Sequence, residues 1–463
     1  MMGSTRSDPL PPSNAPAAQS ARRTAELNAF DVGCVVVGGI IGVGIFFTPA
    51  RVAASVDSSA QVILAWGLGG LLAVLGAFVF AELATLVPGH GGTFRYLHAA
   101  FGPVPAFLYG WANSIVIQAG ALGVVGLILV ENLEVVLGRT FAPFTQVLLA
   151  AALMLAFTAT NAVGLRTGKL VQNTLTVLKV AALCLLVAIA CFARGASGEA
   201  TRAPTGNGMV AMLAMAILPV LFATGGWQQG SFLAGAVRQP RRNMPLGILG
   251  GVAVVIVTYL TVNLAYLSLL GFDGASASKT IGADAAQAAL GGIGGRVLAG
   301  MIVISAAGIM NTICMAPPYV LYAMAQERLF PAAFGRLHER FGTPVVGVLS
   351  QGLWAVALLL LVHFVFAAGS TKDTLGFVCD GVVFADWVFF AACGAALLRL
   401  RGSRADALRL PGGALAAFAF MVLSIAVTVG AVWQQREASL TGLGLTLLGV
   451  PVAAWFLWGA RTR

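Results

Sequence analysis

Two glycine-rich interruptions of apolar sequence are the features best suited to bind a small ligand. They are Gly38-Gly39-Ile40-Ile41-Gly42-Val43-Gly44 and, after Pro219, Phe222-Ala223-Thr224-Gly225-Gly226-Trp227. Where a helix is interrupted, main-chain N–H and C=O groups lose their partners and become available to a ligand. A half-helix that begins at such a break adds a dipole that favours a carboxylate. The two segments therefore predict a main-chain site for a carboxylate.

The spacing of the two segments matters more than either segment alone. Glycine also occurs in membrane helices because it lets them pack closely, so one cluster fits packing as well as binding. The two clusters lie five expected helices apart, near the middle of their spans, and such matching positions indicate a transporter's binding site. Unwound backbone at membrane depth is tolerated where it is buried or lines a cavity. Gly42 and Gly44 are expected to adopt conformations closed to other residues and to let a ligand approach the main chain.

Lys179 is a single basic residue in the middle of an apolar stretch, ten residues from Lys169. A charged side chain at the bilayer centre costs about 2.5–3.5 kcal/mol on insertion scales, and this distance strains snorkelling to the interface. Its expected neighbours on the helix face are mostly apolar, which disfavours the ammonium, whereas carbonyls freed at the first break would stabilise it. We therefore predict that Lys179 is a coupling residue that ties two helices together. A purely structural lysine is the alternative.

The remaining ionisable and sulfur-containing residues carry weaker signals. Glu82 lies near the inner end of an expected helix and is interpreted as a loop-anchoring carboxylate. Asp380 and Asp386 are six residues apart, do not share a helix face, and receive no role. The six cysteines fall in apolar stretches without a CxxC motif and are interpreted as small buried packing residues. The four histidines are scattered without HExxH, so neither a metal nor any other cofactor is expected.

The composition is that of a bilayer protein. Of the 463 residues 59% are hydrophobic and 10% are charged, with a mean hydropathy of +0.90, whereas soluble domains carry about 25% charged residues. The net charge of +10 does not indicate nucleic-acid binding, because the basic residues sit in short loops between apolar stretches. We therefore predict an all-α membrane protein.

Twelve apolar stretches are long enough to be transmembrane helices. They cover residues 29–55, 61–87, 104–130, 142–162, 170–193, 209–237, 246–271, 296–326, 344–367, 374–398, 411–433 and 440–459. Residues 1–26 are rich in Pro, Ser and Ala, lack the pattern of a signal peptide, and are interpreted as a disordered tail. With the N-terminus inside, 18 of the 27 basic residues fall in inner segments and 8 in outer segments, so both termini are predicted to be cytoplasmic.

Several motifs make the sequence resemble the amino acid–polyamine–organocation (APC) superfamily, in particular the bacterial L-amino acid transporter (LAT) branch. The first break matches the GxGIF signature as Gly42-Val43-Gly44-Ile45-Phe46, and the second matches FAxGGW at residues 222–227. Further matches are Ala81-Glu82-Leu83, Phe101-Gly102-Pro103, Arg242-Asn243-Met244-Pro245 and Leu329-Phe330-Pro331. The resemblance covers roughly residues 28–400.

The resemblance implies a LeuT-like fold that works by alternating access. Residues 27–200 and 201–400 would form two inverted five-helix repeats, and 401–463 would add helices 11 and 12 with a short cytoplasmic C-terminus. The substrate carboxylate would meet the amides of Gly42, Val43 and Gly44. The substrate amino group would meet the carbonyls of Ile40, Ile41, Phe222 and Ala223. The ring of Phe222 would also cover the substrate as an aromatic lid. Thr224 and Gly225, at the second break, would complete the site.

The sequence departs from the family pattern at four places. Val43 stands where serine is frequent, so carboxylate binding would rest on backbone groups alone. Thr224 replaces an aromatic residue, which would widen the pocket or add a hydroxyl. Gly235-Ala236 replace an acidic pair, so a gating or loop-anchoring interaction is expected to be missing. Pro317-Pro318 interrupt an expected helix, where each proline removes a hydrogen bond and a kink is expected.

We predict a sodium-independent secondary transporter of small neutral L-amino acids, located in the inner membrane and acting as an exchanger. The alternatives are a proton-coupled symporter that uses Lys179 and a carrier of other amino acids or polyamines. An enzyme is disfavoured because the sequence lacks GxGD, HExxH and a nucleophile elbow, and a channel is disfavoured because it lacks a filter-like loop. No disulfide-linked partner subunit is expected, because the outer loop from Glu131 to Pro143 contains no cysteine.

Overall fold

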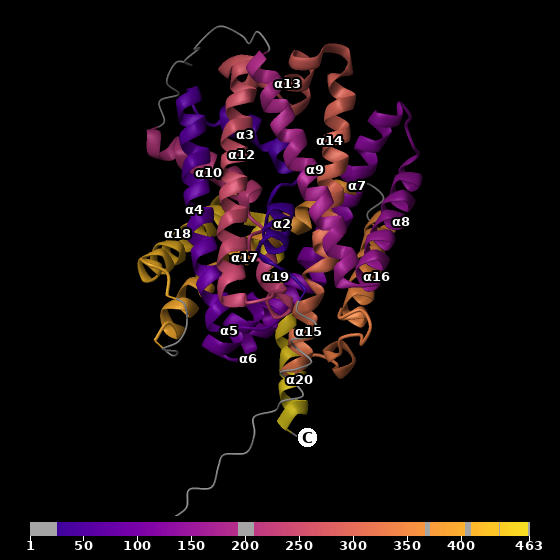
Figure 1. Cartoon of the computed structure of the whole chain (residues 1–463), viewed down its shortest axis with the longest axis vertical. Helices are drawn as coiled ribbons and strands as arrows, with labels where there is room; N and C mark the ends of the chain where they lie inside the picture. Colours follow the sequence, from indigo (N-terminus) through magenta and orange to yellow (C-terminus); the bar gives the residue numbers. More distant parts are fainter. Residues whose placement is uncertain (1–25, 193–207, 366–370, 403–408, 435, 462–463) are drawn as a thin grey trace, which may run out of the picture.

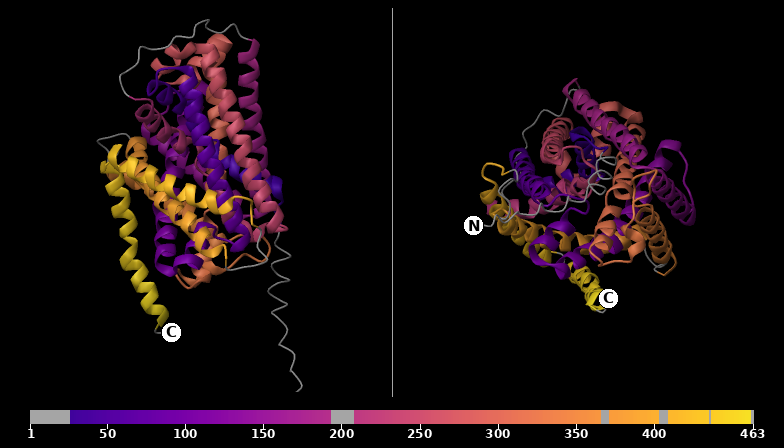
Figure 2. Two further views of the ribbon diagram at one scale, coloured as in Figure 1. Left: turned by 90° about the vertical axis from the view of Figure 1, so that its left-hand side faces the viewer. Right: turned by 60° about the horizontal axis from the view of Figure 1, so that its bottom comes forward.

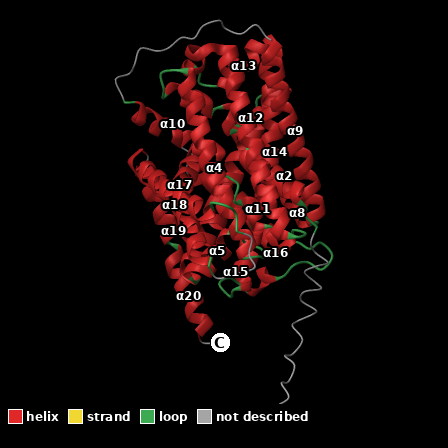
Figure 3. Cartoon of the chain, turned by 60° about the vertical axis from the view of Figure 1, so that its left-hand side comes forward, coloured by secondary structure: helices red, strands yellow, loops and turns green. Residues whose placement is uncertain are grey.

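The structure, a computed structural model, describes residues 26–192, 208–365, 371–402, 409–434 and 436–461 (Figure 1). The predicted disordered tail, residues 1–26, lies almost wholly outside this part of the chain. The described residues are nearly all helical, as Figure 3 shows, and contain a single isolated β-bridge, between Leu27 and Val237.

The helices of the first half follow one another with short connections. They are α2 (Ala29–Ile40), η1 (Gly44–Phe46), α3 (Thr48–Ala54), α4 (Ser59–Leu86), α5 (Thr93–Phe101), α6 (Pro103–Trp111), the π-helical η2 (Ala112–Ile117), α7 (Gln118–Leu137), α8 (Pro143–Ala162) and α9 (Leu165–Phe192). The second half begins with a shorter helix that ends at the second glycine cluster. Its elements are α10 (Met209–Thr224), α11 (Gln229–Phe232), η3 (Ala234–Ala236), α12 (Pro240–Ala277), α13 (Ile281–Leu290), η4 (Gly291–Ile293), α14 (Gly294–Met315), α15 (Pro318–Gln326), η5 (Ala332–Gly335), α16 (Val345–Val365), α17 (Thr371–Leu400), α18 (Gly413–Gln434), α19 (Arg436–Leu447) and α20 (Gly449–Arg461).

Nine helical segments of the described chain are long and apolar enough to cross a bilayer, and the 12-residue α2 is a shorter apolar helix. The chain is therefore a multi-pass membrane protein. Each of the twelve expected stretches coincides with one helix or with consecutive helical segments. The first stretch is divided into α2, η1 and α3, the third into α6, η2 and α7, the sixth into α10, α11 and η3, the eighth into α14 and α15, and the twelfth into α19 and α20. The number of crossings and the inverted repeat stay predictions.

Two short helices were not predicted from the sequence. α5 precedes the third stretch, and α13 lies between the seventh and the eighth. Each buries one narrow face, with Phe94 and Leu97 in α5 and with Ile281 and Ala285 in α13, and leaves the other face more polar. Such helices are too short and too mixed in composition to stand out in a hydropathy profile. The expected kink at Pro317-Pro318 is present as the break between α14 and α15.

The helix α2 lies inside the bundle and contacts α9, α12 and α14 (Figure 1). The helices α17, α18 and α19 pack together on one side, where α17 and α18 also contact α4 (Figure 3). The C-terminal helix α20 extends from one end of the bundle (Figure 2). This arrangement encloses the first glycine break with helices from both halves of the chain.

Large apolar side chains on the periphery are exposed, as a lipid-facing surface requires. Leu185 and Val257 are 60% and 62% exposed, whereas Tyr259 and Trp227 in the interior are almost fully buried. The prediction that the cysteines are buried packing residues is wrong for Cys184 and Cys191. Both lie on the exposed face of α9, because an apolar stretch places residues toward lipid as well as toward protein. The side chain of Cys379 lies outside the described part.

Candidate substrate and coupling site at the two helix breaks

The first break leaves a run of main-chain donors. The helix α2 ends at Ile40, Ile41 is extended with φ −71° and ψ 95°, and its N–H still donates to the Val37 carbonyl at 2.8 Å. Within the described chain, the N–H groups of Val43 and Gly44 have no hydrogen-bond acceptor, whereas the N–H of Gly42 faces the Tyr259 hydroxyl. Two consecutive free donors form the kind of anion site that a helix start provides.

Gly42 and Gly44 matter because they leave room for neighbouring groups, not because their backbone angles are unusual. Neither has a positive φ, so the prediction of conformations closed to other residues is wrong for both. A Cβ on Gly42 would lie 2.4 Å from Ile309 Cδ1, and one on Gly44 would make ordinary contact with Ala223 Cβ at 3.4 Å. Gly42 is therefore fixed by packing against α14, and Gly44 keeps open the space between the breaks.

Gly226 is the glycine of the two breaks whose backbone angle φ favours glycine over other residues. The helix α10 ends at Thr224, Gly225 is extended, and Gly226 has a φ of 122°. A Cβ on Gly226 would lie 2.6 Å from the Gly39 carbonyl oxygen. The two breaks therefore touch backbone to backbone, an approach that a residue with a side chain does not permit.

Two hydroxyl groups bind the carbonyls of the breaks. The Tyr259 hydroxyl of α12 lies 3.0 Å from the Ile40 oxygen and 3.2 Å from the Ala223 oxygen, so one proton is shared between the two breaks. The Ser305 hydroxyl of α14 lies 3.1 Å from the Gly42 oxygen and 3.3 Å from the Ile41 oxygen. Sequence reasoning missed both residues. Their only signal was a polar side chain within an apolar span, which many packing residues share.

Lys179 lies against the end of α2. Its side chain is 2% exposed, and its ammonium donates to the Ile41 carbonyl at 2.7 Å and to the Gly38 carbonyl at 3.2 Å. The last carbonyls of a helix carry partial negative charge, so they suit a cation. In the described part of the chain no carboxylate forms an ion pair with this ammonium. The coupling role of Lys179 stays a prediction, but its position places one positive charge on the break.

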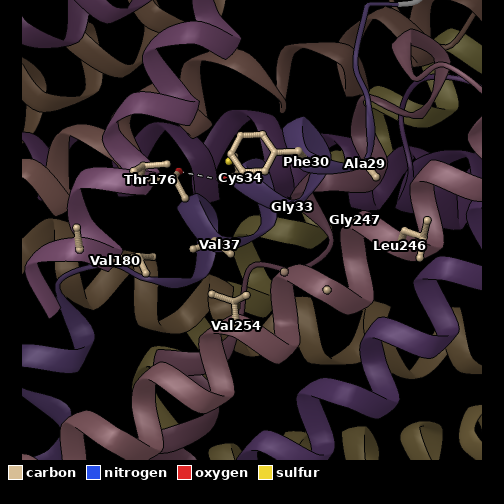
Figure 4. A pocket seen from close by; sticks show the side chains of 14 residues that line it. Ala29, Phe30, Gly33, Cys34, Val37, Thr176, Val180, Leu246, Gly247 and Val254 are labelled. Atoms are coloured by element: carbon tan, nitrogen blue, oxygen red, sulfur yellow. Dashed lines mark hydrogen bonds between the residues drawn. The ribbon is translucent and has the colours of Figure 1, made fainter. Parts of the chain in front are cut away.

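A polar ladder on α9 holds this helix against α2. Thr176 donates to the Cys34 carbonyl at 3.1 Å, a contact visible in Figure 4, and Gln172 donates to the same oxygen at 3.3 Å. Gln172 also accepts from Asn311 of α14 at 2.8 Å. With Lys179 these side chains occupy positions i, i+4 and i+7, which form one face of a helix. Of these three residues the sequence singled out Lys179 alone, because amide and hydroxyl side chains are frequent in helices that pack.

The remaining predicted site residues have these places. The Thr224 hydroxyl donates to the Val220 carbonyl at 2.9 Å, so the expected additional hydroxyl is used within its own helix. The carbonyls of Ile40 and Ala223 share the Tyr259 proton and each keep a second lone pair, whereas the Ile41 carbonyl faces two donors, Lys179 and Ser305. The side chain of Phe222 lies outside the described residues.

Two loops are anchored by an ion pair and by backbone bonds. Glu82, fully buried, lies 2.7 Å from Arg401 and accepts from the Leu410 amide at 3.3 Å, in agreement with its interpretation as a loop anchor. At Gly235-Ala236 the chain is bonded through its backbone, where the Ala236 carbonyl accepts from the Leu27 amide at 3.0 Å. The expected loss of an acidic gating or anchoring interaction at these two residues stays a prediction.

The shape of the pocket around Gly235 explains why no acidic residue stands there. A Cβ on Gly235 would lie 2.5 Å from the ring of His90, which fills this space in the loop after α4. Burial, helped by the charge of Arg95, lowers the pKa of His90 to about 4, so its ring is neutral at pH 7. A carboxylate here would be left without a cation to pair with.

An apolar groove of about 570 Å³ runs along α2 where it meets α9 and α12 (Figure 4). Its lining includes Phe30, Val37, Val180 and Val254, and also Thr176, whose hydroxyl already binds the Cys34 carbonyl. The groove is otherwise apolar, so it does not suit a zwitterion and is not the substrate site. It leaves one face of α2 without close packing, next to the break.

A multi-pass membrane protein with two touching helix breaks, free amides and a buried cation on the break carbonyls has the features of a secondary transporter rather than of an enzyme. The sequence profile of the family described as "Amino acid permease" matches residues 27–453. The chain therefore belongs to the amino acid permease family, within the LAT branch of the APC superfamily.

Known relatives cover most of the chain at moderate identity. The b(0,+)-type amino acid transporter 1 of Mus musculus is 28% identical over 390 residues, which are 81% of this chain and 75% of the relative. The serine/threonine exchanger SteT of Bacillus subtilis is 28% identical over 335 residues, 71% of this chain and 74% of the relative. The human cystine/glutamate transporter is 26% identical over 440 residues, 93% of this chain and 85% of the relative.

Proposed function

We propose that this protein exchanges small neutral L-amino acids across the inner membrane by alternating access, without sodium. Its termini face the cytoplasm, and the two halves of the chain form inverted repeats. The observation that carries the proposal is the break itself. Free amides of Val43 and Gly44 lie beside carbonyls that bind the Lys179 ammonium group, which is 2.7 Å from the Ile41 oxygen.

The free amides suit the substrate carboxylate, and the neighbouring carbonyls suit its amino group. Each α-amino acid carries both groups on one carbon, so one short break can bind the two at once. Ile40 and Ala223 present carbonyls with a remaining lone pair, and the Ile41 carbonyl lies between them and the Lys179 ammonium. These contacts use only the groups common to all amino acids. Selection among amino acids must therefore come from contacts between the substrate's side chain and another part of the pocket.

The charges around the breaks favour a neutral side chain. A buried cationic side chain needs a carboxylate partner, and Asp31, the acidic residue of α2, is paired with Lys169 at 3.3 Å near the start of the helix. The sequence of α7 offers Ala119, Gly120 and Ala121 near the breaks, which leave room for a modest side chain. The relative named as a serine/threonine exchanger agrees with this size class, whereas the one named for cystine and glutamate does not.

The lysine supports sodium independence and exchange. An ammonium on the Gly38 and Ile41 carbonyls satisfies the oxygens that a sodium ion at this break would need. If this charge stays in place throughout the cycle, the lysine itself carries no coupled ion, and one amino acid leaves as another enters. The groove beside α2 supports alternating access, because it gives this helix room to move. We expect the protein to work without a disulfide-linked partner subunit.

The test is uptake of radiolabelled amino acids into proteoliposomes that contain the purified protein. We expect saturable uptake of alanine or serine that requires unlabelled amino acid inside and is equal in sodium and choline buffers. Arginine, glutamate and putrescine should compete poorly. Uptake that depends on sodium, or stronger competition by arginine or a diamine than by alanine, serine or leucine, would refute the proposal.

A further inference from the structure

Asp386 on α17 is a buried carboxylate that neither the breaks nor the loop anchors use. It is 8% exposed, and its Oδ1 has no hydrogen-bond partner. None of the ion pairs found among the described residues includes it. A charged carboxylate inside a membrane span is costly, and such residues mark ion pathways and proton relays.

The two other buried carboxylates on helices of the bundle show what a structural role looks like. Glu82 lies 2.7 Å from Arg401 and accepts a backbone amide. Asp31 binds Lys169 at 3.3 Å, accepts from Asn173 at 2.7 Å and caps α2. Both are therefore satisfied as anions. Asp386 lacks this compensation, although it is buried to a similar extent.

The surroundings of Asp386 contain polar groups on the third apolar stretch. Tyr109, at the end of α6, is fully buried and interacts electrostatically with Asp386. The next six residues form the π-helical η2, which packs against α17. On η2 the Asn113 Nδ2 and the Ser114 Oγ are buried without hydrogen-bond partners. A π-helical turn often marks a functional site, and here it adds unpaired polar groups beside a helix with an unpaired carboxylate.

The ligand that suits this carboxylate is a proton. A metal cation needs a shell of oxygen ligands, and no group of three or more metal-binding side chains occurs among the described residues. The neighbours of Asp386 along α17 are instead aromatic and thiol side chains, Trp387, Phe389, Phe390 and Cys393. A proton requires one oxygen, and binding it removes the cost of the charge.

No titratable group on the helices packed against α17 forms an ion pair with Asp386 among the described residues. Tyr109 and Cys393 lie within electrostatic range of Asp386, and the buried Tyr96 on α5 lies within range of both. The helices α18 and η2 carry no titratable group. The remaining groups are paired or lie toward helix ends: Arg95 and His98 on α5, beside Glu327; Glu82 on α4, paired with Arg401; Glu131 and Glu134 on α7; His363 on α16; and Arg436 and Glu437 on α19.

We propose that Asp386 is a proton-binding site of the transport cycle, which takes up a proton from water on one side of the membrane and releases it to water on the other. Amino acid movement then responds to a pH gradient, in addition to the exchange proposed above, on which this inference rests for its substrate. The proton carrier is a carboxylate between α17 and the third apolar stretch, and Lys179 remains a fixed cation.

The experiment measures amino acid accumulation and proton movement together, in sodium-free proteoliposomes with a pH-sensitive dye inside. With one proton per amino acid, a gradient of one pH unit drives accumulation of at most about tenfold. We expect the wild-type protein to accumulate alanine several-fold and to acidify the lumen. Asp386→Asn, which keeps the size but not the charge, should lose both responses and keep its exchange rate within about twofold. Asp273→Asn, at an exposed position of α12, is the matched control and should keep all three.

The outcomes separate this inference from the proposed exchange. A wild-type protein that exchanges alanine but moves no protons refutes the proton site and leaves the exchanger intact. Proton-driven uptake without exchange refutes the exchanger alone. Retained proton-driven accumulation in Asp386→Asn refutes the inference, and so does a loss confined to cationic substrates, which would make Asp386 a substrate-recognition residue. If Asp386→Asn does not fold, Asp386→Glu should keep the coupling with a shifted pH midpoint, and an unchanged midpoint counts against the site.

Discussion

Replacing Lys179 with methionine tests the proposed role of the buried cation most directly. Methionine is similar in length and flexibility, so it fills the same space, but it donates no hydrogen bond and carries no charge. In the wild-type protein the ammonium is the side-chain donor to the Gly38 carbonyl at 3.2 Å and one of two donors to the Ile41 carbonyl. After the change Ser305 still reaches the Ile41 oxygen, whereas the Gly38 oxygen has lost its recorded partner.

The magnitude follows from that single unpaired carbonyl. Leaving a buried acceptor unsatisfied costs about 1–3 kcal/mol. This cost destabilises the conformation in which the break carbonyls bind Lys179, so exchange should slow by roughly tenfold to a hundredfold. The free energy of unfolding should fall by less, because the variant no longer buries an ammonium. Gly308→Ala probes the same contact without removing the charge, since its Cβ would lie 2.7 Å from the Lys179 Nζ.

The assay is the initial rate of alanine exchange in proteoliposomes, with thermal unfolding in detergent measured in parallel. Lys279→Met, which removes an exposed lysine between α12 and α13, is the control and should leave both quantities unchanged. Wild-type exchange in Lys179→Met would refute the reasoning. A rate loss matched by an equal loss of folded protein would assign Lys179 to stability alone.

Three further substitutions address the two breaks. Gly44→Val should fold, because its Cβ would make ordinary contacts, but it should lose substrate affinity at least tenfold, because its methyl groups enter the space between the breaks. Binding of labelled alanine measures this, and an unchanged affinity contradicts it. Gly226→Ala should lower the melting temperature by several degrees, because strain at a positive φ costs about 1–3 kcal/mol. The control Gly300→Ala, which has open space around its Cβ, should leave the melting temperature unchanged. Tyr259→Phe should weaken binding and exchange by about tenfold, since it removes the donor shared by the two breaks at a cost of about 1–2 kcal/mol; an unchanged affinity for alanine would show that this bond is dispensable.

Hydropathy and glycine spacing were sufficient to predict the helices and the places where two of them break. The same length rule left out α5 and α13, because short helices at the membrane surface bury only one narrow face each. Lys179 was predictable because a lone charge in an apolar span is rare. A residue-type signal of this kind does not depend on knowing which helices are neighbours.

The partners of the break could not be predicted, because they come from helices distant in sequence. Tyr259 and Ser305 lie more than two hundred residues after Ile40, and nothing in their local sequence indicates which carbonyl they reach. The sequence also did not indicate why glycine is needed at each position of the breaks. It marked Gly42, Gly44 and Gly226 alike, but only Gly226 has a backbone angle that requires glycine, and this distinction exists in three dimensions only.

The polarity of the first break follows from which of its groups already have partners. Donors from three different helices, Lys179, Tyr259 and Ser305, bind the carbonyls of Gly38, Ile40, Ile41 and Gly42. No acceptor in the described chain binds the amides of Val43 and Gly44. The break is therefore satisfied on its negative side and open on its positive side, before any substrate arrives. Such a site attracts a carboxylate more strongly than an amine, because the amine finds only second lone pairs. If the substrate carboxylate is the main anchor, amino acid amides should bind far more weakly than amino acids, whereas deaminated acids should retain part of the affinity. The reverse order of affinities would show that the amino group, and not the carboxylate, is read at this break.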